Sequence, residues 1–171
     1  MAGCSSLESL RIILCMISLS NGSLMVPAAF TQHTIVLPFN DEEAVKAALA
    51  ANKHQVAGII LEPVPGNAGV YLPKPGYLEF LREITKADGA LLIFDEVLSA
   101  FRMGAGGAQE YLNMTPDLCT LGKAVGGGYP LSVFGGRRDI MQRLMPLGDC
   151  QHSGTYNGHP VVVAAGLAAV R

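Results

Sequence analysis

The sequence predicts an α/β fold in which helices pack on a mostly parallel sheet. Two near-continuous apolar runs of strand length, residues 56–61 and 90–94, are typical of strands that are covered on both faces. A segment with helical periodicity lies between them, opened by Pro75 and stopped by Gly89. This alternation of buried strands and an amphipathic helix favours a parallel sheet whose strands are joined through helices.

The first part of the chain adds a strand and a capped helix. Residues 34–37 are a short apolar run that we expect to form a strand. Asn40 is predicted to cap the following helix, with Glu43 three residues later completing a capping box. The apolar stripe of this helix consists of Ala44, Val45, Ala48 and Leu49.

Three further elements are expected toward the C-terminus: a strand over 131–134, a helix over 137–144 and a last helix over 161–170. Residues 1–25 differ from the rest because they are serine-rich, contain cysteines and lack clear capping signals. The expected organisation is therefore a divergent N-terminal segment followed by one domain over 26–171.

Composition limits the classes of function. The chain has 171 residues, of which half are hydrophobic and 15% charged, so it can bury a substantial core. Its net charge of −2 gives no electrostatic case for a nucleic-acid partner. No stretch reaches the roughly 18 apolar residues of a membrane span, and the apolar run at 12–19 is interpreted as an ordinary buried or poorly defined segment.

The four cysteines have no metal-ligand or disulfide spacing. They are Cys4, Cys15, Cys119 and Cys150. This distribution is typical of free thiols in a reducing compartment, so we expect no metal site and a cytoplasmic location, or a plastid if the source is a photosynthetic eukaryote.

Two residues carry the chemistry. Asp95 directly follows the apolar strand 90–94, and Lys123 lies between apolar residues and a glycine run. Ligands of open α/β sheets bind at the carboxyl ends of strands, and a buried amine or carboxylate is costly unless it has a task. Together the two residues fit an enzyme that holds pyridoxal 5′-phosphate (PLP), with the lysine linked to the cofactor as a Schiff base and the carboxylate paired with the ring nitrogen.

Plainer interpretations stay open for both residues. Asp95 could cap a helix or loop, and Lys123 could be a solvent-facing lysine at a helix start. A phosphate-binding Walker loop fails, because Asp117 stands where that loop needs glycine and Ala124 replaces its magnesium-binding Ser or Thr.

A set of ordered motifs runs through the chain from about Val26 to the C-terminus. They are Leu61-Glu62-Pro63-Val64 with Gly66-Asn67, Leu92-Ile93-Phe94-Asp95-Glu96-Val97, Gly106-Gly107-Ala108-Gln109, Thr115-Pro116-Asp117-Leu118, Thr120-Leu121-Gly122-Lys123 with Gly126-Gly127-Gly128, Phe134-Gly135-Gly136-Arg137-Arg138 and Ser153-Gly154-Thr155. In order and spacing the sequence resembles the class III (ω-type) PLP-dependent aminotransferases. Within that family it is most similar to the glutamate-1-semialdehyde 2,1-aminomutases.

The resemblance implies a partial large domain of PLP-dependent transferase fold type I. It implies that Lys123 links to PLP and moves a proton between substrate carbons, and that Asp95 pairs with the pyridine nitrogen. Asn67 matches a residue that hydrogen-bonds the ring hydroxyl.

Three more site residues follow from the same resemblance. Thr155 matches a threonine that reaches the phosphate of the partner subunit's cofactor, although it could instead be a turn residue that caps the next helix, a role for which His159 competes. Glu62 and Val97 match pocket positions, and Val97 is expected to pack against the ring face.

Three functions are compatible with these residues. The first is an aminomutase that converts glutamate 1-semialdehyde to 5-aminolevulinate for tetrapyrrole synthesis. The second is an ω- or β-amino acid transaminase, which stays open because residues 153–160 depart somewhat from the usual aminomutase sequence. The third is a truncated, catalytically silent fragment, because the family's N-terminal part and its small C-terminal domain are not recognisable here. The resemblance also implies a small amino-acid-type substrate and a homodimer.

Overall fold

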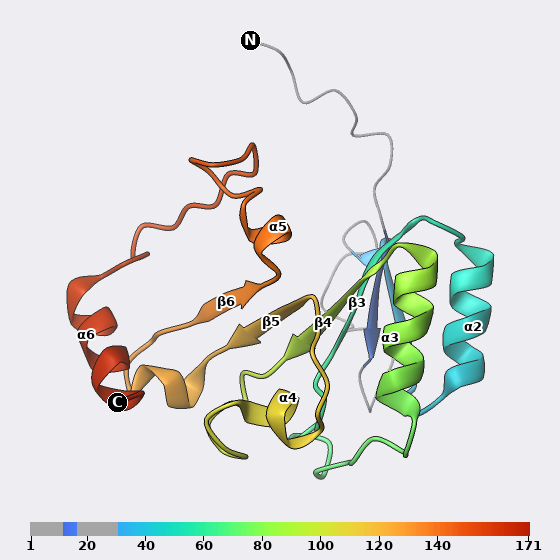
Figure 1. Ribbon diagram of the computed structural model, residues 1–171, viewed down its shortest axis with the longest axis horizontal. Helices are drawn as coiled ribbons and strands as arrows, with labels where there is room; N and C mark the ends of the chain where they lie inside the picture. Colours follow the sequence, from blue (N-terminus) through green and yellow to red (C-terminus); the bar gives the residue numbers. More distant parts are fainter. Residues whose placement is uncertain (1–11, 17–30) are drawn as a thin grey trace. The chain divides into compact units, whose positions relative to one another are not determined.

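The computed structural model describes the backbone of residues 12–16 and the whole of residues 31–171. It divides into two compact units, Met1–Leu92 and Ile93–Arg171, which are described separately. Figure 1 shows the strands and helices of each.

The first unit contains three parallel strands in the order β2-β1-β3. They are β1 (Ile12–Met16), β2 (Thr34–Leu37) and β3 (Val56–Leu61). The predicted strands 34–37 and 56–61 are confirmed. The apolar run at 12–19 contains β1, which pairs with both of the other strands and is therefore the middle strand of this group.

Two helices, α2 (Glu42–Ala51) and α3 (Tyr77–Asp88), lie side by side in the first unit (Figure 1). Helix α2 contacts β2 and α3 contacts β3. The apolar stripe predicted for α2 points inward, because Val45 and Leu49 are buried. The core between these elements consists of Val45, Leu49, Val56, Ile59, Leu61, Leu78 and Leu81.

The predicted cap of α2 is wrong by one residue. Asp41 is the N-cap, and its Oδ1 accepts a hydrogen bond of 2.9 Å from the amide of Ala44. Asn40 is used elsewhere, because its Oδ1 accepts from the amide of Lys74 at 2.8 Å, 34 residues away. Glu43 pairs with Lys46 instead of closing a capping box.

The second unit contains β5 (Leu118–Leu121), β6 (Val133–Gly136) and the last three residues of β4 (Leu91–Asp95), whose first two residues belong to the first unit. β4 and β5 are parallel, and β6 is antiparallel to β5. The predicted strand 131–134 is two residues too early. The amide of Arg137 donates to the carbonyl of Asp117, and its guanidinium binds the Asp117 carboxylate at 2.8 Å. This clamp extends the β5–β6 pairing through Gly136.

Four helical elements complete the second unit: α4 (Gly107–Tyr111), the short 3₁₀ helix η1 (Lys123–Gly126), α5 (Arg138–Met141) and α6 (Pro160–Ala169). The helix predicted over 137–144 is only four residues long. The carbonyl of Arg143 accepts from the amide of Cys150 at 2.8 Å, so the chain closes a loop here instead of adding a helical turn.

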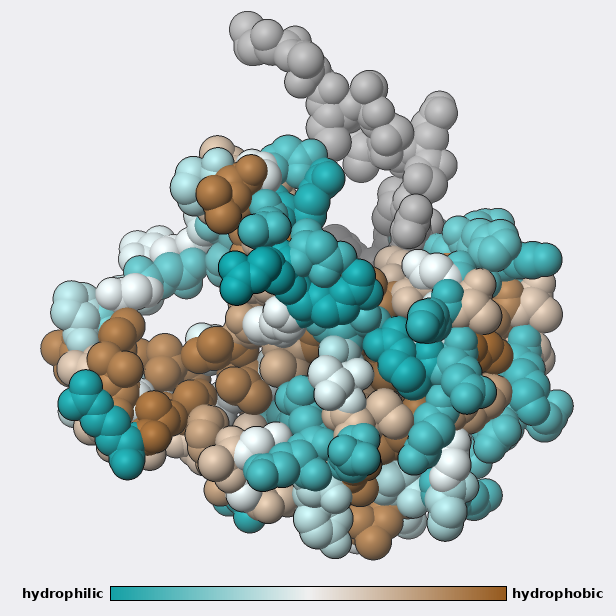
Figure 2. All heavy atoms as spheres, in the orientation of Figure 1, coloured by the Kyte–Doolittle hydropathy of each residue, from teal (hydrophilic) through white to brown (hydrophobic). Residues whose placement is uncertain are grey.

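Helix α6 contacts η1 and leaves much of its apolar surface exposed (Figure 2). Its exposed side chains include Val161, Val163 and Leu167. Within residues 12–16 and 31–171, no helix has the length and apolar character that crossing a membrane requires. Cys119 and Cys150 are free thiols, whereas Cys4 and the side chain of Cys15 lie outside the description.

The ring of Tyr77, at the start of α3, packs into the first unit. It is 1% exposed and meets the ring of Phe39 edge-on, with 5.4 Å between centroids. Burial raises the pKa of Tyr77 from the ordinary 10.0 to about 12. The neutral phenol therefore adds stability that is complete below the unfolded value and disappears as the pH rises through about 12.

We expect the free energy of unfolding to fall between pH 10.0 and about 12, and to fall less in Tyr77→Phe. Urea unfolding at several pH values, followed by circular dichroism, measures this difference. Tyr71→Phe is the matched control because Tyr71 is 51% exposed. An equal alkaline loss in wild type and Tyr77→Phe would contradict the assignment.

Candidate functional site

The carboxyl ends of β4 and β5 lie at the same edge of the second unit, because the two strands are parallel neighbours. Asp95 is the last residue of β4 and is paired in register with Thr120 of β5. Lys123 begins η1 and is separated from the end of β5 by Gly122 alone. The two residues singled out in the sequence thus lie at the carboxyl ends of neighbouring strands, where open α/β sheets bind ligands.

The Asp95 carboxylate is half-buried and held in one orientation. Its Oδ1 accepts hydrogen bonds from the amide of Val97 at 3.0 Å and from the hydroxyl of Thr120 at 3.3 Å. Both donors approach the same oxygen, so the second oxygen can face a cationic partner. A loop-capping role for Asp95 is therefore present as well, through Val97, and it serves to orient the carboxylate.

Lys123 is exposed in this chain, so the expectation of a buried amine is wrong. Its φ of 48° is in the left-handed region, which is uncommon for a residue other than glycine. The turn is closed by the amide of Val125, which donates to the carbonyl of Gly122 at 3.3 Å. The chain thus turns just after β5, and the lysine side chain is exposed at this turn, at the carboxyl-terminal end of the strand.

The side chain of Val97 lies next to Gly122, the residue that precedes Lys123. A Cβ added to Gly122 would come within 3.1 Å of Cγ1 of Val97, which is tighter than an ordinary van der Waals contact. Glycine at position 122 thus lets the turn after β4 and the turn after β5 approach each other. The apolar surface of Val97 is half-buried at this junction.

Glu62 and Asn67 belong to the first unit. Glu62 follows β3, and its Oε2 accepts from the amide of Gly66 at 3.4 Å. Asn67 is exposed in the turn that begins at Gly66. The carboxylate of Glu62 thus helps to close the turn that carries Asn67.

Thr155 is exposed in a turn that precedes α6. The alternative interpretation, in which it caps this helix, is wrong because His159 occupies the N-cap position. The side chain of His159 makes no capping hydrogen bond either. Thr155 therefore remains available to a ligand at the surface of the second unit.

The sequence interpretation missed Glu96, which is 0% exposed. Its carboxylate accepts four hydrogen bonds, all from neutral donors. Oε2 accepts from the hydroxyl of Ser99 at 3.0 Å and the amide of Ala108 at 2.6 Å. Oε1 accepts from the backbone amide of Gln109 at 3.3 Å and from its side-chain amide at 2.8 Å.

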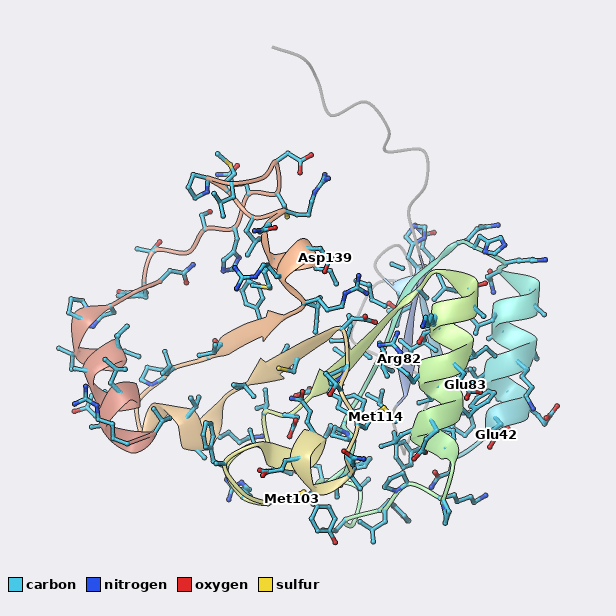
Figure 3. The ribbon with its side chains drawn as sticks, viewed as in Figure 1. Glu42, Arg82, Glu83, Met103, Met114 and Asp139 are labelled. Atoms are coloured by element: carbon cyan, nitrogen blue, oxygen red, sulfur yellow. The ribbon has the colours of Figure 1, made fainter. Side chains whose placement is uncertain are left out.

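Three of these donors come from the loop and short helix between Met103 and Met114, which Figure 3 labels on either side of α4. Gly107 has a φ of 65°, and a Cβ at this position would collide with Oε2 of Glu96. A Gly-Gly pair some ten residues after an acidic strand end is a signal that could have indicated this contact.

The site thus combines an exposed amine, an oriented carboxylate and an apolar side chain. An amine can add to an aldehyde, and a fixed carboxylate oxygen can pair with a protonated ring nitrogen. The apolar surface of Val97 can pack against a flat ring. The donor set therefore fits the aldehyde and the ring of PLP.

Comparison with known proteins gives the same family. Residues 18–171 match the family model described as aminotransferase class-III. The glutamate-1-semialdehyde 2,1-aminomutase of Methanocaldococcus jannaschii is 52% identical over 146 residues, which are 85% of this chain and 34% of the relative. The protein of the same name from Ignicoccus hospitalis is 53% identical over 149 residues, 87% of this chain and 35% of the relative. The chain thus spans about a third of the length of these curated relatives.

Solved structures agree in fold. An omega-transaminase from Sphaerobacter thermophilus is 33% identical and superimposes with a TM-score of 0.84 over 95% of this chain and 43% of its own. A structure described as a transaminase with PLP bound gives a TM-score of 0.85 at 30% identity, over 95% of this chain and 44% of its own. With the family match over residues 18–171, these likenesses establish that the chain belongs to the class-III aminotransferase family.

Proposed function

We propose that this chain carries the cofactor-binding centre of a PLP-dependent aminomutase that converts glutamate 1-semialdehyde to 5-aminolevulinate. The observation that carries the proposal is that Asp95 ends one of two neighbouring parallel strands and Lys123 follows the end of the other. Relatives named glutamate-1-semialdehyde 2,1-aminomutase, at about 50% identity, support the choice of reaction.

In this proposal the cofactor supplies an aldehyde that condenses with amines and a ring that withdraws electrons from the reacting carbon. Lys123 Nζ holds the aldehyde end and moves a proton between adjacent substrate carbons. Asp95 keeps the ring nitrogen protonated through its oriented carboxylate. Val97 packs on the ring face.

The other three residues have proposed roles at the edges of the cofactor. Asn67 donates to the ring hydroxyl, and Thr155 reaches the phosphate of the cofactor in a partner subunit. Glu62 lines the substrate pocket and also holds the turn of Asn67 through the amide of Gly66. The homodimer is part of this proposal, and the exposed apolar side chains of α6 offer surface that a second subunit could cover. The cytoplasmic location stays a prediction.

A transaminase is the second candidate function. Two solved structures with TM-scores of at least 0.80 are described as an omega-transaminase and a beta-phenylalanine aminotransferase. Their identities of 33% and 34% are lower than the 52% of the aminomutase from M. jannaschii, which favours the aminomutase. The two reactions differ in stoichiometry, because an aminomutase needs no separate amino acceptor.

We expect borohydride to fix PLP on Lys123 when the full chain is incubated with the cofactor. Peptide mass spectrometry locates the label, which should disappear in Lys123→Ala and persist in Lys53→Ala, a matched exposed lysine. A chain that carries no label at Lys123 would rule out the proposed site and leave the catalytically silent protein.

We also expect isomerisation of glutamate 1-semialdehyde without any added amino acceptor. The amino and oxo groups exchange between adjacent carbons, so substrate and product have the same atoms. Asp95→Asn should keep the label on Lys123 but slow turnover about a hundredfold or more, since it removes a charge that stabilises the transition state. Conversion that strictly requires a 2-oxo acid would favour the transaminase, and full turnover of Asp95→Asn would contradict the role of Asp95.

A further inference from the structure

We propose that Glu96 is a positioning residue that holds the Asp95 carboxylate in its working orientation. The claim that this orientation serves a cofactor rests on the proposed function, whereas the claim that Glu96 orients Asp95 does not. Glu96 is the next residue along the chain from Asp95 and is fully buried, so it does not reach a ligand itself. It acts through the backbone that the two residues share.

The main chain of Glu96 is fixed to β5. Its amide donates to the carbonyl of Thr120 at 2.9 Å, and the hydroxyl of the same threonine donates to Oδ1 of Asp95. Its carbonyl accepts from the amide of Ala100 at 3.0 Å. Thr120 therefore joins the backbone of Glu96 and the side chain of Asp95 in one hydrogen-bonded unit.

The side chain of Glu96 fixes the other face of the same turn. Its four donors come from Ser99, Ala108 and Gln109, so the carboxylate links the turn after β4 to the start of α4. The hydrogen bonds described for this carboxylate all come from neutral donors, and a buried carboxylate without a cationic partner is retained at a cost. That cost indicates a specific requirement for its geometry.

The two anchors restrict the backbone between Asp95 and Val97. The amide of Val97 donates to Oδ1 of Asp95 at 3.0 Å, and its side chain packs on Gly122. Without the hydrogen bonds from the amides of Ala108 and Gln109 to Glu96, the turn after β4 is free to rotate. The Val97 amide would then no longer donate to the Asp95 carboxylate. Asp95 would then lose one of the two donors that orient it.

The isosteric variant Glu96→Gln breaks this arrangement without changing volume. A glutamine amide has one oxygen and one NH₂ group, so one of the two positions becomes a donor. The hydroxyl of Ser99 and the side-chain amide of Gln109 can reorient. The backbone amides of Ala108 and Gln109 cannot, so at least one of them is left facing a donor.

The test uses the cofactor-free full chain and nuclear magnetic resonance of the Val97 amide. In wild type the chemical shift of this amide should follow ionisation of the carboxylate it binds, and Asp95→Asn should abolish the response. We expect Glu96→Gln to abolish it as well and to raise amide exchange at Val97 about tenfold or more. Glu110→Gln is the matched control, because the exposed Glu110 accepts from Gly106 on the same loop and should leave Val97 unchanged.

A Val97 response that persists in folded Glu96→Gln would overturn the proposal. If that variant does not fold, Glu96→Asp keeps the charge but shortens the side chain by one methylene, so its carboxylate cannot accept from the amides of Ala108 and Gln109 in the same geometry. The Val97 response should then fall, and an unchanged response would equally overturn the proposal. With PLP added, Glu96→Gln should keep the label on Lys123 and slow turnover, as Asp95→Asn does, while Glu110→Gln should leave turnover unchanged. If wild type itself does not bind PLP, the proposed function fails, yet the amide measurement still decides the role of Glu96.

Discussion

The candidate site depends on the parallel pairing of β4 with β5. This pairing puts Thr120 opposite Asp95, and the threonine then bonds both the Asp95 side chain and the Glu96 backbone. Because both strands end at the same edge, the turn that carries Lys123 starts beside the carboxylate. A change in register between the two strands would separate the amine from its partner, since each residue of slip moves a strand by about 3.3 Å.

Around this pairing, glycine and buried carboxylates control how closely the loops approach. Gly122 admits the side chain of Val97, and Gly107 admits the carboxylate of Glu96. Asp117 and Arg137 clamp the far end of β5 to β6. A buried backbone amide that is left without an acceptor costs about 1–3 kcal/mol of stability. The polar contacts therefore select one arrangement of the loops more than they add net stability.

Local patterns in the sequence predict the elements that local physics determines. The apolar runs gave β2 and β3 with their observed bounds, and the position of Asp95 at a strand end was confirmed. Contacts between distant residues explain the failures. Asn40 fits an N-cap by composition, but Lys74 engages its side chain, and Asp41 takes the cap. Nothing in the local sequence distinguishes Glu96 from a surface acid, because its burial depends on the loop at Gly107, which is distant in sequence.

The exposure of Lys123 is a further departure from what the sequence predicted. Flanking apolar residues suggested a buried amine, yet Lys123 is exposed at a turn where its backbone is left-handed. The central claim is that this lysine and Asp95 act on one cofactor. The most direct measurement is the nitrogen resonance of PLP carrying a ¹⁵N label in its ring, bound to the full chain. The account predicts a protonated ring nitrogen in wild type and its loss in Asp95→Asn. An unprotonated nitrogen in wild type, with Lys123 linked to the cofactor, would contradict it.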